Sequence, residues 1–167
     1  NEESNKNIKE VIERVTKLDM AQQQIIGIND SINSLEKILN DKKARGTFGE
    51  IRLHQIFISI FGENNNEIYE EQYQLPNDKR VDFMFHAPDP IGDLAIDSKF
   101  PLENFNNLIN AEDDKKLDEY RKLFKKDIKK HIDDISSKYI IEGETADGAL
   151  MFLPSEAVYA ELHANFP

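Results

Sequence analysis

The sequence predicts an α/β fold, a mixed α+β sheet domain that follows a long N-terminal coiled-coil helix. Three observations predict this fold. From Ile8 to Leu39, apolar residues recur in steps of three and four, the spacing of a coiled-coil seam. From Arg80 to Phe100, apolar residues alternate with polar ones, as in a pair of strands. Residues 149–153 (ALMFL) form an uninterrupted apolar run, typical of a strand buried on both faces.

Residues 1–44 form the first predicted domain, a long helix. The rhythm of its seam slips once, around Gly27, where two successive steps of three indicate a stammer. We expect the helix to associate with a second copy of the chain, giving a homo-oligomer, or with a partner helix; packing back on its own domain is the alternative. The predicted seam positions are Ile8, Val11, Val15, Leu18, Gln22, Ile25, Ile28, Ile32, Leu35 and Leu39.

A second helix is predicted from Glu50 to Phe61, after the charged segment 41–45 (DKKAR) and residues 46–49 (GTFG). Glu50 falls on the apolar side of this helix, and a carboxylate is seldom buried without a partner. One explanation is the helix dipole near the N-terminus or a pairing with His54. The other is that Glu50 reaches a cluster of acidic residues elsewhere in the fold.

Such a cluster is predicted in the segment that follows the first expected strand, residues 68–75 (IYEEQYQL). If the loop at 87–92 reverses the chain symmetrically, directly opposed residues share one face of the sheet. The opposed pairs are then Asp82 with Asp97, Met84 with Ala95, and His86 with Asp93. Lys99 lies two residues beyond Asp97 and therefore on the same face.

Two adjacent carboxylates repel each other, and a divalent cation removes that repulsion. Oxygen donors suit Mg²⁺ or Mn²⁺, and a neighbouring lysine stabilises a phosphate or holds a water for attack. Glu50 would join this cluster under the second explanation above. The alternative is that Asp82 and Asp97 are solvated at strand ends and that Lys99 is a surface charge guarding an edge.

The remaining segments complete the predicted core. Residues 100–110 read as irregular, and 112–137 as a helix with an apolar stripe that includes His131, interpreted as a packed core histidine. Ser155 is expected to cap a last helix over 156–165. The opposite side of the 112–137 helix is either a solvated surface or a contact to phosphates. That side carries Lys122, Lys125, Lys126 and Lys129.

Composition limits the function. The chain has 32 acidic and 21 basic residues, a net charge of −11, which argues against indiscriminate nucleic-acid binding over the whole surface. It has no cysteine, which excludes disulfides and thiolate metal sites. No run is long and apolar enough for a membrane span, so we expect no membrane contact within this fragment.

The order of helix, three strands, helix and strand resembles the core of the PD-(D/E)XK nuclease superfamily. Several motifs resemble, more closely, the RmuC family of bacterial DNA recombination proteins. These motifs are 46–50 (GTFGE), 71–72 (EQ), 81–82 (VD), 96–102 (IDSKFPL), 131–132 (HI), 135–139 (ISSKY) and 150–156 (LMFLPSE). The proline that names the superfamily is absent, because Val81 precedes Asp82. The resemblance implies a restriction-endonuclease-like αβββαβ core over residues 45–167, truncated at its C-terminus.

The resemblance also implies roles for single residues. Asp82 and Asp97 would bind Mg²⁺ or Mn²⁺, with the backbone carbonyl of Ser98 as a further ligand. Lys99 would orient or deprotonate the attacking water. Glu50 would complete the metal shell or position a water. We expect contacts to nucleic acid from Arg45, Gln72 and Lys138.

The predicted function is that of a metal-dependent DNA nuclease in recombination or repair, with Glu50, Asp82, Asp97 and Lys99 as catalytic residues. The alternative is a non-catalytic module that binds DNA or organises partners with a nuclease fold on a coiled coil. We expect a cytoplasmic location in a bacterium. In this family a coiled-coil region often follows a membrane anchor, so an anchor upstream of residue 1 is compatible with the sequence.

Overall fold

The structure is a computed structural model that describes residues 14–24, 27, 34, 36–37 and 39–166. The chain forms two compact units, residues 1–42 and 43–167. In the first unit, the described residues up to 40 are helical, as predicted for this segment. The seam residues Val15 and Leu18 are 59% and 69% exposed. Most of the predicted seam and the stammer next to Gly27 lie outside the described residues, and the pairing of the helix stays a prediction.

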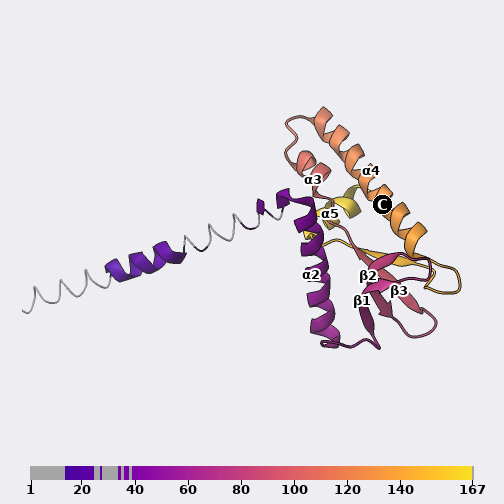
Figure 1. Cartoon of the computed structure of the whole chain (residues 1–167). Coiled ribbons are helices and arrows are strands. Elements are labelled where there is room, and N and C mark those ends of the chain that lie inside the picture. Colours follow the sequence, from indigo (N-terminus) through magenta and orange to yellow (C-terminus); the bar gives the residue numbers. More distant parts are fainter. Residues whose placement is uncertain (1–13, 25–26, 28–33, 35, 38, 167) are drawn as a thin grey trace, which may run out of the picture. The chain divides into compact units, whose positions relative to one another are not determined.

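The second unit is a four-stranded mixed sheet with helices on both faces (Figure 1). The strands lie in the order β1-β2-β3-β4, with β3 and β4 parallel and the other pairs antiparallel. The mixed α+β class is therefore confirmed, while the specific restriction-endonuclease core stays a prediction. The elements are α2 (Lys42–Phe61), β1 (Tyr69–Gln74), β2 (Arg80–His86), β3 (Asp93–Ser98), α3 (Leu102–Ile109), α4 (Asp114–Tyr139), β4 (Ala149–Phe152) and α5 (Glu156–Asn165).

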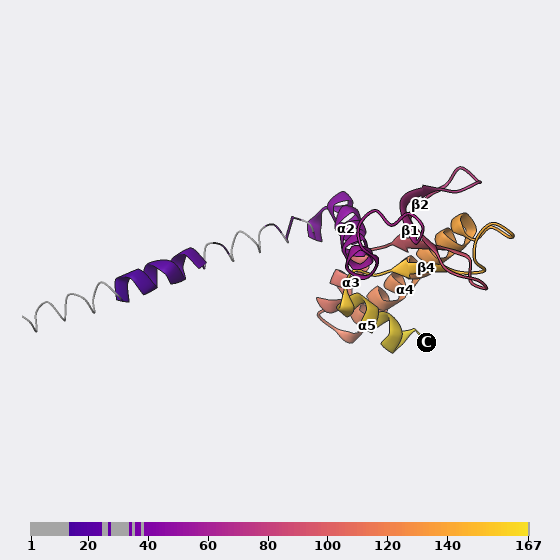
Figure 2. The ribbon, with the colours of Figure 1, turned by 90° about the horizontal axis from the view of Figure 1, so that it is seen from below.

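Alternation along β2 and β3 separates the two faces of the sheet. Phe83 and its register partner Ile96 pack with Leu53 and Phe57 of α2. The next pair, Met84 and Ala95, packs on the other face with Ile135 and Tyr139 of α4. Because successive strand side chains point to opposite faces, α2 and α4 cover opposite sides of the sheet. The ribbon shows this arrangement in two views (Figures 1 and 2).

Two predictions about the helices are wrong. Helix α2 begins at Lys42 and includes Gly46 and Gly49, whereas the sequence predicts a helix that starts at Glu50. Residues 102–109 form helix α3, although that segment was predicted to be irregular. Its apolar residues recur every three positions and are buried against α4 and α5, which stabilises a helix too short to persist alone. The buried side chains of α3 are Leu102, Phe105 and Leu108.

Strand β4 is also placed differently from its prediction. It is an edge strand of the sheet, and Leu150 is 50% exposed, so it is not buried on both faces. A continuous apolar run does not distinguish a central strand from an edge strand, because an edge strand packed against helices also carries apolar residues. The cap of α5 is as predicted, since the Ser155 hydroxyl accepts a hydrogen bond from the Val158 amide at 3.3 Å.

Candidate functional site

The β2–β3 hairpin brings the two predicted aspartates together. The observed register pairs Met84 with Ala95 and His86 with Asp93, as the sequence predicts. Continued by two residues, this register sets Asp82 opposite Asp97. A hydrogen bond across the strands supports the placement, because the Ser98 amide donates to Asp82 Oδ2 at 2.8 Å. The two carboxylates therefore lie side by side at one end of the sheet.

Asp97 is the most buried carboxylate of the site, at 2% exposure. A buried carboxylate needs compensating partners. Lys99 supplies one, because its ammonium forms an ion pair with Asp97 Oδ2. Tyr139, at the end of α4, places its hydroxyl near enough to Asp97 for the carboxylate to act on it. Burial and the negative charge of Asp97 both raise the pKa of the Tyr139 hydroxyl, which keeps it protonated and able to donate.

Asp82 is half-buried beside this pair. Burial raises its pKa, the hydrogen bond from Ser98 opposes that effect, and the charge of Asp97 raises the pKa again. The net direction is upward. A raised carboxylate pKa means that negative charge is unfavourable at this position. A cation bound beside Asp82 would relieve that cost.

Glu50 approaches the same group from α2. Burial raises the pKa of Glu50, and the charges of Asp82 and Asp97 raise it further, while Lys99 lowers it. Glu50 Oε2 accepts a hydrogen bond from Gln72 Nε2 at 3.2 Å. The helix dipole does not explain Glu50, because α2 begins eight residues earlier and Glu50 lies beyond its first turn. A pairing with His54 does not explain it either, because His54 forms its ion pair with Glu71.

Gly49 makes this approach of α2 sterically allowed. A Cβ at position 49 would overlap the Ser98 hydroxyl and would lie 3.4 Å from Pro154 Cγ and 3.5 Å from Ser98 Cβ. The backbone of α2 therefore contacts β3 closely, next to the strand end that carries Asp97 and Lys99. The sequence singles out Gly49 only as part of the motif 46–50 (GTFGE), because a contact between residues far apart in the chain leaves no pattern in a single sequence.

His131 lies on the α4 side of the cluster and is half-buried. Burial lowers the pKa of His131, and the Lys99 ammonium lowers it further, so the imidazole is neutral at pH 7. The carboxylates of Asp127 and Asp134 act in the opposite direction. The histidine therefore lies near the site and is half-buried, whereas the sequence predicts a packed core residue.

The three residues predicted to contact nucleic acid are not gathered in one place. Gln72 lies at the cluster and bonds Glu50. Arg45 is half-buried in the first half of α2. The side chain of Lys138 is exposed near the end of α4, and its backbone carbonyl accepts a hydrogen bond from Asn77 at 2.8 Å. Contact of these residues with DNA stays a prediction.

The donor chemistry of the cluster fits a hard cation, although its side chains do not converge on one point. Within the described residues, no group of three or more His, Cys, Asp or Glu could hold a metal ion. The cluster nevertheless offers carboxylates from Glu50, Asp82 and Asp97, the ligand type that Mg²⁺ and Mn²⁺ prefer. Burial, and after it the charges of neighbouring carboxylates, raises the pKa of Glu50 and of Asp82, and a divalent cation would offset both effects.

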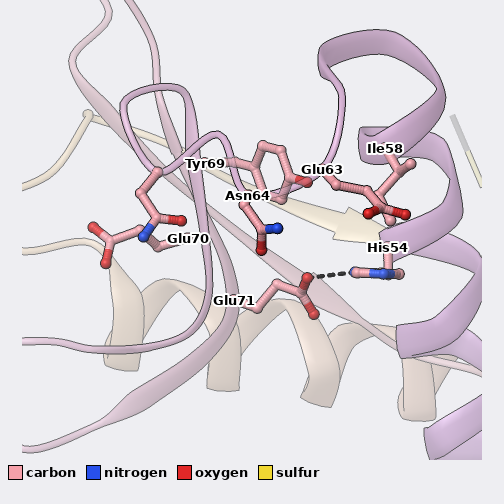
Figure 3. A pocket seen from close by; sticks show the side chains of 8 residues that line it. His54, Ile58, Glu63, Asn64, Tyr69, Glu70 and Glu71 are labelled. Atoms are coloured by element: carbon pink, nitrogen blue, oxygen red, sulfur yellow. Dashed lines mark hydrogen bonds and ion pairs between the residues drawn. The ribbon is translucent and has the colours of Figure 1, made fainter.

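A cavity of about 540 Å³ opens elsewhere, between α2 and the start of β1 (Figure 3). His54 and Glu71 point toward each other across it and form an ion pair. None of the predicted site residues lines this cavity. Its lining residues are His54, Ile58, Glu63, Asn64, Asn66, Tyr69, Glu70 and Glu71.

Comparison with known proteins identifies relatives. The model of the RmuC family matches residues 1–167. A "DNA recombination protein RmuC homolog" of Xylella fastidiosa is 31% identical over 172 residues, covering 93% of this chain and 35% of that protein. One of Pasteurella multocida is 34% identical over 161 residues, covering 92% and 30%. One of Haemophilus influenzae is 28% identical over 146 residues, covering 81% and 32%.

The chain spans about a third of the length of these curated relatives. No solved structure matches the chain significantly. Among the described residues, no helix combines the length and the apolar character that a membrane crossing requires.

Proposed function

The chain belongs to the RmuC family, and on that premise we propose that it carries the catalytic centre of a metal-dependent DNA nuclease that acts in DNA recombination or repair. The relatives are named DNA recombination proteins, which supports the process. The observation that carries the chemistry is the meeting of Asp82, Asp97 and Lys99 at one end of the sheet, with Glu50 supplied by α2.

Each residue has a distinct role in this proposal. Asp82 and Asp97 would hold Mg²⁺ or Mn²⁺, together with the Ser98 carbonyl and Glu50. The bound metal would act as a Lewis acid on the phosphate and lower the pKa of a water. Lys99 Nζ, already held at Asp97, would orient that water and offset negative charge that develops on the phosphate. Tyr139 would fix the Asp97 carboxylate through its hydroxyl.

The test is a cleavage assay on single-stranded, duplex and branched DNA with Mg²⁺ or Mn²⁺. It is run on this chain and on a version extended to the length of its relatives. We expect metal-dependent product from the wild type, none after addition of a chelator, and none from Asp97→Asn or Lys99→Ala. A Lys99→Ala variant that still cleaves would contradict the mechanism assigned to this lysine.

Asp93→Asn is the matched control. Asp93 lies on the same strand and face as Asp97, but its carboxylate bonds His86 at 2.8 Å, at the other end of the strand. This variant should cleave like the wild type. If no protein forms product with any metal while DNA is still bound, the nuclease proposal is wrong and a non-catalytic DNA-binding module takes its place.

A further inference from the structure

One stretch of α4 departs from the acidic character of the protein. The ten residues 121–130 (RKLFKKDIKK) contain six basic residues and one acidic residue, in a chain whose net charge is −11. Such a local excess of positive charge marks a surface for an anionic partner when the charges share one face and are not neutralised by neighbours. Both conditions are met here.

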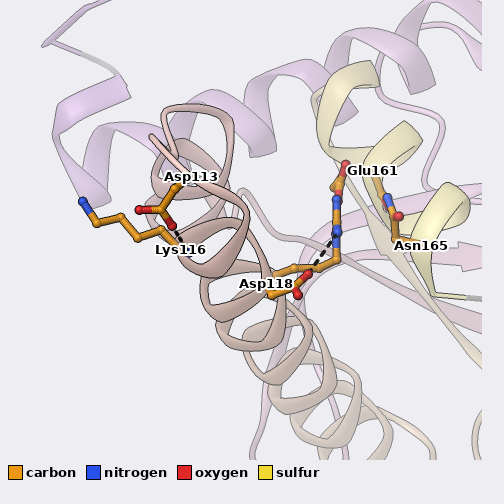
Figure 4. Close-up of polar contacts among 6 residues, drawn as sticks. Asp113, Lys116, Asp118, Glu161 and Asn165 are labelled. Carbon is orange, nitrogen blue, oxygen red and sulfur yellow. Dashed lines mark hydrogen bonds and ion pairs between the residues drawn. The ribbon is translucent and has the colours of Figure 1, made fainter.

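The helix sorts these charges by side. The one carboxylate, Asp127, turns inward and accepts a hydrogen bond from Asn104 of α3 at 2.6 Å. Arg121 turns toward α5, where its Nε donates to Glu161 Oε1 at 3.3 Å (Figure 4). A second guanidinium nitrogen of Arg121, Nη1, lies 3.8 Å from Asp118 Oδ1. Lys125 lies over the Phe166 ring, 5.3 Å from its centroid.

Four exposed lysines remain on the outer side, and we call them the α4 lysine face: Lys122, Lys126, Lys129 and Lys130. No ion pair with a described carboxylate involves any of them. Along an α-helix, Lys122, Lys126 and Lys129 fall within about 60° of one another and span about 10 Å. Lysines three and four apart repel each other, so the fold gains nothing from gathering them.

We propose that the α4 lysine face binds the phosphate backbone of nucleic acid. This inference rests on the proposed function for the choice of DNA as the polyanion. The face lies on the side of α4 opposite Phe124 and Ile128, which are buried, and hence away from the cluster around Asp97. It is a second contact surface, separate from the catalytic centre, that helps to hold DNA on the protein.

The chemistry of the face favours nucleic acid over a lipid surface. A helix that lies on a membrane inserts an apolar side below its basic edge, but the apolar side of α4 is buried within the domain. Lysine is a compact charge that contacts phosphates without the paired geometry that arginine offers to a base. Binding through this face is therefore independent of sequence and dependent on salt.

The test compares two variants that remove the same charge. The first is the triple substitution Lys122→Gln, Lys126→Gln and Lys129→Gln. The control carries Lys17→Gln, Lys42→Gln and Lys79→Gln, three exposed lysines that do not belong to α4. Affinity for a fluorescent DNA duplex is measured by anisotropy with a chelator present, from low to high salt, and the fold is checked by urea unfolding.

We expect the first variant to bind the duplex at least tenfold more weakly at about 0.15 M salt, because it lacks three phosphate contacts. The slope of its log affinity against log salt should also be flatter, by about 0.9 for each lost contact. The control should change affinity less than twofold. Equal weakening in both variants would reduce the effect to net charge and overturn the proposal. Unchanged binding by the first variant would overturn it too.

Two further outcomes separate this surface from its alternatives. If the wild type binds phosphatidylserine vesicles more tightly than DNA, and only the first variant fails to bind the vesicles, the partner is a membrane and the proposal is wrong. Cleavage is scored in a parallel assay with metal. A first variant that binds DNA like the wild type while the wild type cleaves would reject the lysine face and leave the nuclease standing. Wild-type cleavage with selective loss of binding in the first variant supports both proposals.

Discussion

Substitution of Gly49 by alanine tests the close contact between α2 and β3. Gly46 and Gly49 both lie within α2, and alanine in a helix interior is normally stabilising relative to glycine by about 1 kcal/mol. The surroundings of the two positions differ. A Cβ at Gly46 meets nothing within 4 Å, whereas a Cβ at Gly49 overlaps the Ser98 hydroxyl. The same change should therefore have opposite effects at the two positions.

The expected magnitude follows from two opposing terms. Gly46→Ala should raise the free energy of unfolding by up to about 1 kcal/mol. Gly49→Ala gains the same helix term but forces α2 away from β3, and overpacking of this kind typically costs about 1–3 kcal/mol. The two variants should differ by about 1–3 kcal/mol, with Gly49→Ala the less stable.

The assay is urea unfolding, monitored by the change in tyrosine fluorescence. The chain has no tryptophan, and its five tyrosines all lie in the second unit, so the signal reports that unit. Removing the Ser98 hydroxyl should restore stability, because Gly49→Ala combined with Ser98→Ala no longer has the overlap. Equal stabilisation by Gly46→Ala and Gly49→Ala would refute the contact. A double variant as unstable as Gly49→Ala alone would refute the role of the hydroxyl.

Three further predictions concern the core and the pH dependence. Tyr139→Phe removes a buried hydroxyl next to the Asp97 carboxylate and should cost on the order of 1.5–3 kcal/mol in urea unfolding, against a negligible effect of Tyr159→Phe at an exposed position. Phe124→Ala empties a fully buried site and should cost about 3–5 kcal/mol, whereas Leu123→Ala, at 38% exposure, should cost far less. Burial lowers the pKa of His86, but hydrogen bonds to Asp93 and Glu70 outweigh it and raise the pKa above 6.5. The stability that His86 contributes is therefore complete below pH 6.5 and is lost as pH rises through the folded-state pKa. The stability difference between wild type and His86→Gln should shrink from pH 6 to pH 9, and a constant difference would contradict this sign.

The candidate site was predictable where it depends on local pattern. Strand alternation and a symmetric loop are enough to set Asp82 opposite Asp97, because register in a hairpin follows from the chain itself. The bounds of α5 and its Ser155 cap were equally readable, since capping is a matter of neighbouring residues. The family resemblance carried the residue roles, and the family is the part that the comparisons bear out.

Other features depend on contacts between residues far apart in sequence. The sequence alone predicted a helical N-terminal segment, a β-hairpin with opposed aspartates and an acidic composition with a lysine-rich stretch at 121–130, because these follow from periodicity and composition. Only the tertiary structure decided that α2 passes over Ser98 at Gly49, that Tyr139 reaches Asp97, and that 102–109 is helical. The physical reason is that burial against a distant partner, rather than local preference, supplies the stabilising free energy at each of these places.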